Sequence, residues 1–145
     1  ETYNWLKEIF QNSTDWGTRL GAIEAIAEHY PDESDSFMIL EAAAKDYDWG
    51  VRCTAIRTIP KYFSNQIDIF TFLCKIIQND PFQRNLSWED NPRKTALEGL
   101  IEHCLSNPKT LELLRDRAIN DPDEQLRQWA QEQLKMQNFK LESEE

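Results

Sequence analysis

A segment at residues 48–59 recurs along this chain, and this recurrence constrains the fold more than any other feature of the sequence. Related segments begin at residues 15, 90 and 123. Each has an acidic residue in a turn, then an arginine, an alanine three residues after the arginine and an aliphatic residue seven after it. The four arginines are 33, 41 and 34 residues apart. Intervals of this length are typical of helical units that stack into a solenoid.

The recurring residues have the chemistry that stacked helices require. An acid at the start of a helix satisfies free backbone N–H groups, so we expect the recurring aspartates to cap helices. A small alanine lets two helices approach closely. We expect each arginine to bond to the hinge of its own unit or of the next one. The recurring positions are the aspartates Asp15, Asp48, Asp90 and Asp123, the arginines Arg19, Arg52, Arg93 and Arg127, and the alanines Ala22, Ala55, Ala96 and Ala130.

Each recurring segment carries apolar residues at helical spacing, and a weaker helical pattern precedes it. The sequence therefore predicts an all-α fold, a right-handed α-solenoid (α-α superhelix) of about four helix pairs whose second helices line a gently concave face. We expect one domain over residues 1–137, with pairs at about 1–30, 34–63, 66–105 and 108–137. The third pair contains an inserted loop at 81–89, and residues 138–145 are expected to form a frayed acidic tail.

Helix pairs at these intervals, with aspartate in the hinge and arginine shortly after it, resemble HEAT repeats over nearly the whole chain. Within that superfamily, residues 107–130 are similar to the repeats that follow the ATPase module in bacterial NACHT-domain proteins. The Asp-Trp-Gly-x-Arg turns at 15–19 and 48–52 resemble the same family. The resemblance implies the sensor or scaffold end of a signalling ATPase, in a class that includes anti-phage defence proteins. The third unit departs from the pattern, because it carries the insertion and has Asn-Pro in place of Trp-Gly.

The ATPase itself is not encoded in these residues. The chain has no Gly-x-x-x-x-Gly-Lys-Ser/Thr loop to hold phosphates, so any ATPase module must lie outside it. The first residue is glutamate rather than methionine. We therefore expect a fragment joined covalently to an upstream domain, or a processed product.

Composition restricts the class of partner. The formal net charge of −10 repels phosphate backbones on average, so we expect no nucleic-acid partner. Three cysteines without a Cys-x-x-Cys motif indicate a reducing, cytoplasmic setting. No stretch approaches the ~20 apolar residues that a membrane span needs. We expect a cytoplasmic domain that binds a protein or peptide.

The sequence offers no reaction chemistry, so we expect no enzyme activity, no cofactor and no metal. His29 and His103 are isolated histidines in helical patterns, whereas a zinc site needs three or four convergent ligands. No nucleophile has a neighbouring base in a known catalytic pattern.

The candidate partner contacts are Trp88 and Arg84 in the inserted loop, because loops that are longer than their counterparts often carry function. Trp16 and Trp49 share one hinge position. They either contact a partner or cover the junction between neighbouring pairs.

Two other functions stay open at this point. HEAT-like repeats also occur in phycobilin lyases, so the chain could be an accessory of chromophore attachment, which would need an apolar cleft with basic groups for the propionates. Nucleic-acid binding along the groove would need a basic second-helix face, whereas the first such helix carries Glu24 and Glu28 beside Arg19 only.

Overall fold

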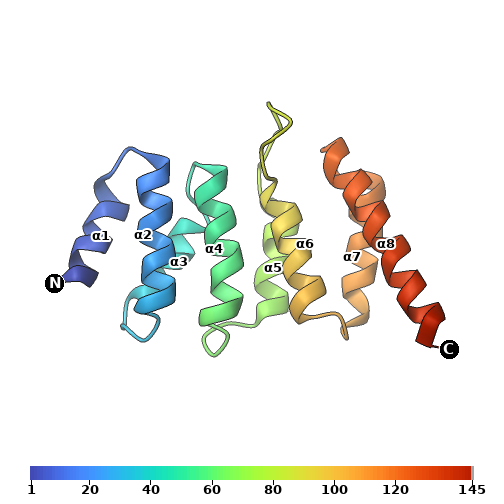
Figure 1. The fold of residues 1–145 in the computed structure, drawn as a ribbon, viewed down its shortest axis with the longest axis horizontal. Coiled ribbons are helices and arrows are strands. Elements are labelled where there is room, and N and C mark those ends of the chain that lie inside the picture. Colours follow the sequence, from blue (N-terminus) through green and yellow to red (C-terminus); the bar gives the residue numbers. More distant parts are fainter. Residues whose placement is uncertain (145) are drawn as a thin grey trace.

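The chain folds into a single row of α-helices. The computed structural model describes the backbone of residues 1–144 and the side chains of residues 1–138. Over this range it contains eight helices and no strand. Figure 1 shows the helices side by side from one end of the molecule to the other. Their bounds are α1 Thr2–Asn12, α2 Trp16–His29, α3 Ser36–Ala43, α4 Trp49–Tyr62, α5 Ile69–Asn79, α6 Pro92–His103, α7 Pro108–Asn120 and α8 Glu124–Glu144.

The helices form four consecutive pairs, α1/α2, α3/α4, α5/α6 and α7/α8, so the all-α solenoid predicted from the sequence is confirmed. The turns within pairs lie together along one edge of the row, the upper edge in Figure 1, and we call it the hinge edge. Between α5 and α6 a long excursion, which contains the inserted loop 81–89, rises from this edge. Helix α8 runs past residue 137 to Glu144, where a frayed tail was expected; the side chains of 139–144 and all of Glu145 lie outside the described residues.

Two apolar cores fill the row. The first joins α1 to α4 around Ile23, Ile26 and Leu40, all fully buried. The second joins the middle of the row to α7 and α8 around Leu73, Leu97 and Leu114. Ile56 projects from α4 into the second core, so α4 belongs to both. The four recurring alanines all lie buried in these cores: Ala22, Ala55, Ala96 and Ala130.

The second helices of the first three pairs pack directly on one another. Helix α2 lies along α4, and α4 lies along α6, whereas none of the consecutive first helices makes a comparable contact in the described structure. A layer whose helices are closer together lies on the inside of a bend. The inner face of the row is therefore formed by α2, α4 and α6, with α4 in the middle.

Candidate functional site

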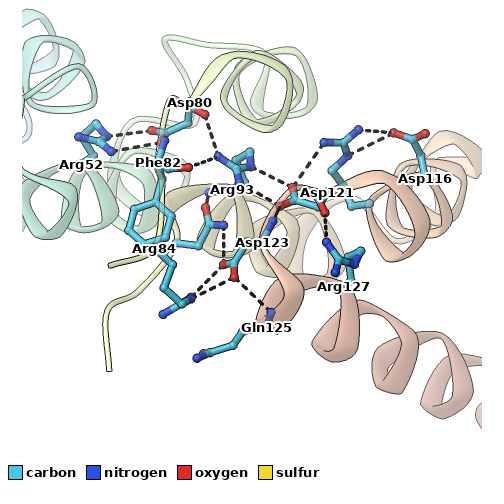
Figure 2. A network of polar contacts seen from close by, with 12 residues as sticks. Arg52, Asp80, Phe82, Arg84, Arg93, Asp116, Asp121, Asp123, Gln125 and Arg127 are labelled. Carbon is cyan, nitrogen blue, oxygen red and sulfur yellow. Dashed lines mark hydrogen bonds and ion pairs between the residues drawn. The ribbon is translucent and has the colours of Figure 1, made fainter. Parts of the chain in front are cut away.

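An arginine–aspartate ladder runs along the hinge edge. Arg52, near the start of α4, donates from Nε and Nη2 to the two carboxylate oxygens of Asp80 in the next hinge, at 2.9 and 3.2 Å. Its Nη1 donates to the backbone carbonyls of Asp46 and Tyr47 in its own hinge, at 3.0 and 3.1 Å. Each such arginine therefore ties two consecutive hinges together, and Figure 2 shows the part of this network around Asp80 and Asp121.

The same pattern occurs on both sides of Arg52. Arg19 makes a bidentate pair with Asp46, and Arg93 makes one with Asp121, in which both distances are 2.9 Å. Arg127 ends the ladder: among the described residues its one acceptor is the backbone carbonyl of Asp121, at 2.6 Å from Nη1. The three aspartates were not among the recurring positions found in the sequence. They were detectable as acids at the matching place in the hinge sequences 45–48, 79–81 and 120–123.

The recurring aspartates lie at helix starts, with one exception. The Oδ2 of Asp15 accepts from the Thr18 N–H at 2.8 Å, Asp48 accepts from Val51 at 3.0 Å, and Asp123 accepts from Gln125 at 3.1 Å. In the third pair the expectation for Asp90 is wrong. The cap of α6 is Asn91, whose Oδ1 accepts from Arg93 N–H at 2.9 Å; it precedes the proline Pro92 that opens the helix.

The inserted loop is fastened to the start of α8. Arg84 donates from Nε and Nη2 to the carboxylate of Asp123 at 3.0 and 2.9 Å, and its Nη1 donates to the carbonyls of Leu86, Ser87 and Glu89. Figure 2 shows the pairing of Arg84 with Asp123. The structure therefore uses the Arg84 guanidinium within the chain, where the sequence suggested a partner contact.

Burial raises the pKa of Asp123, but the hydrogen bonds from Arg84 and Asn91 and the charge of Arg84 outweigh this, so the pKa is lowered overall. The Asp123 side chain is 4% exposed and that of Arg84 16%. A buried carboxylate that is satisfied in this way stays ionised and holds the loop by charge-assisted bonds.

Trp88, the other loop residue singled out from the sequence, faces solvent. Trp88 is 68% exposed. Its ring centroid lies 6.0 Å from that of Trp49, and the two ring planes are tilted by 60°. Trp16, 55% exposed, lies beside the start of α4, where a Cβ added to Gly50 would be 3.9 Å from its ring. The three tryptophans thus lie along the hinge edge at the starts of α2 and α4 and in the inserted loop.

A groove lies on the inner face of the row, over α4 and between α2 and α6. It has a volume of about 430 Å³. We call it the central groove; its walls are α2 with Glu24 and Glu28 and α6 with Glu98 and Glu102, and its floor is α4 with Thr58. On this floor Ile56 and Pro60 are buried and Thr58 is half-buried.

Acidic side chains outnumber basic ones in the central groove. Four glutamates line its walls, and the basic residues Arg57 and Lys61 lie on its floor, with His103 at the end of α6. Desolvation by the surrounding groove raises the pKa of Glu98, and the nearby carboxylate of Asp90 raises it further, against the opposing effects of Lys94 and Arg57. A rise of this kind marks a carboxylate that lacks a full complement of positive charge.

The described part of the chain shows no arrangement for metal or thiol chemistry. No three His, Cys, Asp or Glu side chains converge there as metal ligands. Burial raises the pKa of the Cys53 thiol to about 11, so the thiolate needed for nucleophilic chemistry is scarce at neutral pH. No helix among the described residues is long and apolar enough to cross a bilayer. What the inner face and hinge edge offer is a shaped, charged surface.

Comparison with known proteins agrees with the repeat architecture. A family model for HEAT repeats matches residues 3–88, which is more than half of the chain. No curated protein and no solved structure matches the chain. The matched range begins in α1 and ends at Trp88, so it includes the hinge-edge tryptophans and two of the three helices of the central groove.

Proposed function

Since the chain belongs to the HEAT-repeat family, we propose that it is a protein-interaction scaffold that binds a segment of a partner protein in the central groove. The observation that carries this proposal is the recess over α4, which has α2 on one side and α6 on the other and is open to solvent. A channel of this shape accommodates a chain segment better than a flat surface does, because it removes more of the segment from water.

The central groove is also held in a fixed shape before any partner arrives. Its floor helix α4 packs on both wall helices, and Thr95 of α6 donates to the Cys53 sulfur of α4 at 3.4 Å. The arginine ladder fixes the ends of the same helices at the hinge edge. A preformed site binds more tightly than a flexible one, because less conformational entropy is lost on binding.

The test is to fill the groove. Twelve-residue peptides are first selected from a random library for binding to the chain, and their affinities are then measured by fluorescence anisotropy. Thr58→Trp places a large side chain on the floor, and we expect the selected peptides to bind it at least about tenfold more weakly. Met38→Trp is the matched control, because Met38 lies exposed on α3, outside the inner face. Equal affinities of the selected peptides for the two variants would show that the groove is not the site.

We also propose that this scaffold is the C-terminal region of a NACHT-type signalling ATPase, where it senses a ligand or restrains the motor. The similarity of residues 107–130 to the repeats of such proteins supports this, and the segment forms α7, its hinge and the start of α8. The check is to read the coding sequence upstream of Glu1. A phosphate-binding loop there is the expected result, and an upstream region without any ATPase module would refute the proposal.

The charge of the central groove disfavours the two other functions considered from the sequence. Bilin propionates and nucleic-acid phosphates are both anionic, and the walls present Glu24, Glu28, Glu98 and Glu102. Like charges repel, so the groove disfavours both ligand classes.

A further inference from the structure

We propose that Trp49 and Trp88 form a binding site for an arginine or lysine side chain, and that the partner segment is therefore basic. This inference rests on the proposed function, because it assigns the chemistry of the segment that enters the central groove. It is carried by four features of the hinge edge: a fastened loop, the exposed ring of Trp88 against the half-buried ring of Trp49, acidic residues beside them, and an acidic line that leads into the groove.

The loop that carries Trp88 is held by bonds on both sides of its tip. Glu89 Oε1 accepts from the backbone N–H groups of Asn85 and Leu86, both at 2.6 Å. Gln125 of α8 donates from Nε2 to the Ser87 carbonyl at 3.3 Å, in addition to the clamp between Arg84 and Asp123. A loop so fastened holds Trp88 in solvent at a fixed place, which is the arrangement expected of an anchor for a partner.

The two indole rings meet at a corner, and the exposed ring of Trp88 offers a face to a cation. The ring centroids are 6.0 Å apart with the planes tilted by 60°, and Trp88 is 68% exposed. Elsewhere the chain places a cation over an aromatic ring five times, on the rings of Tyr3, Tyr47, Tyr62, Phe82 and Trp129. Among the described residues no cation lies over Trp49 or Trp88. Indole is the aromatic ring that attracts a cation most strongly, and at this corner two indole rings lie side by side.

The residues that follow Trp88 supply negative charge. The pKa of Glu89 is lowered by the N–H groups of Leu86 and Asn85, and further by the charge of Arg84 and by the Trp49 side chain, so its carboxylate stays ionised. Asp90 comes next and is exposed. The nearest arginine of the loop, Arg84, is already paired with Asp123. The corner therefore attracts a cation both through the indole faces and through the adjacent carboxylates.

Helix α6 connects this corner with the central groove. Asp90 lies just before the helix, and its charge acts on Glu98, which is followed one turn later by Glu102. Lys94 lies on the same helix with its ammonium 5.5 Å from the Trp129 ring centroid, and its charge partly offsets that of Glu98. From Asp90 to Glu98 the rise along a helix is about 12 Å, which an extended peptide covers in about four residues. The segment that fits has basic residues roughly four apart.

The probe is a twelve-residue Gly/Ser peptide with arginine at every fourth position. Its counterparts carry lysine, norleucine or glutamate at the same positions, and all are measured by calorimetry at 0.15 M salt. We expect the arginine and lysine peptides to bind and the other two not to bind. We expect Trp88→Ala to weaken binding of the arginine peptide by about three- to thirtyfold, and Trp88→Phe to have an intermediate affinity. Trp5→Ala is the matched control, because Trp5 is a 60% exposed tryptophan on α1.

Two results would overturn the inference. Equal binding of the norleucine peptide would make the corner an apolar pocket, and an unchanged affinity for Trp88→Ala would place the cation elsewhere. The groove-filling Thr58→Trp variant separates this from the proposed function. Loss of arginine-peptide binding in Thr58→Trp but not in Trp88→Ala refutes the tryptophan site alone. Loss in Trp88→Ala but not in Thr58→Trp supports the tryptophan site and refutes the groove.

Discussion

Arg84 and Asp123 are 39 residues apart in sequence, yet the guanidinium of one meets the carboxylate of the other in two hydrogen bonds of 3.0 and 2.9 Å. The pair joins the inserted loop of the third repeat to the start of α8, beside the ladder contact between Arg93 and Asp121. In the rest of the hinge edge an arginine near the start of a second helix reaches the aspartate of the following hinge. Arg84 adds a further link of the same kind from the inserted loop.

Arg84→Ala should destabilise the protein and release the loop. It leaves the Asp123 carboxylate buried with Asn91 as the main remaining side-chain donor, and breaking one partner of a largely buried pair costs about 3 kcal/mol. Arg84→Lys keeps the charge but cannot make the bidentate contact, so we expect a loss of about 1–2 kcal/mol. Urea denaturation at pH 7 measures both.

Arg115→Ala is the matched control, since Arg115 is an exposed arginine on α7. It should change the free energy of unfolding by no more than about 0.5 kcal/mol. A loss in Arg84→Ala as small as this would mean that the loop contributes nothing to holding the last two pairs together.

The ladder predicts that alanine substitutions of two equivalent arginines lower the free energy of unfolding by different amounts. Arg52→Ala removes a bidentate pair with Asp80 and two bonds to carbonyls, and it leaves the Asp80 side chain 2% exposed, so we expect a loss of about 3–5 kcal/mol. Arg127→Ala removes a single described bond to a carbonyl, so we expect about 1 kcal/mol. Thermal unfolding followed by circular dichroism gives the order. Similar melting temperatures for the two variants would show that pairing with the next hinge does not stabilise the fold.

The recurring segments made much of this fold predictable. The spacing of Arg19, Arg52 and Arg93 located the second helices, and the buried alanine three residues later marked their packed face. These features depend on residues close in sequence, whose periodicity is visible without a structure. The repeat frame also predicted the hinges, although not which neighbour, Asp90 or Asn91, caps α6.

The functional surface was harder to predict from the sequence. The corner between Trp49 and Trp88 joins residues 39 apart across two helices, and no local pattern encodes such a contact. The same holds for Arg84, whose acceptor lies in the next repeat. The central groove depends on how far α4 is recessed between α2 and α6, which is set by packing and not by any one helix.

The contribution of Arg84 to stability should disappear in acid. The folded-state pKa of Asp123 is lowered from 3.8, so the stabilisation is fully present above that value and is lost as the pH falls through the lower folded-state pKa. We therefore expect the difference in unfolding free energy between the native chain and Arg84→Ala to be constant from pH 7 to about pH 5 and to shrink below pH 3.8. Urea titrations at intervals of pH measure it. A difference that persists undiminished at pH 2.5 would show that Arg84 acts through its packing and carbonyl bonds, without the Asp123 charge.

Replacing two glycines of second helices by alanine should change the stability of the protein in opposite directions. A Cβ added to Gly21 of α2 meets nothing within 4 Å, so Gly21→Ala should stabilise the protein by about 0.5–1 kcal/mol through helix propensity alone. A Cβ added to Gly99 of α6 would lie 3.0 and 3.4 Å from the two Cδ atoms of Leu73, which is fully buried on α5. Overpacking there costs about 1–3 kcal/mol, which exceeds the gain in propensity, so Gly99→Ala should be destabilising. Urea denaturation of the two variants side by side gives both signs. If Gly99→Ala stabilises the protein as much as Gly21→Ala, the α5/α6 seam can widen freely, and Gly99 is not what permits the close approach of these two helices.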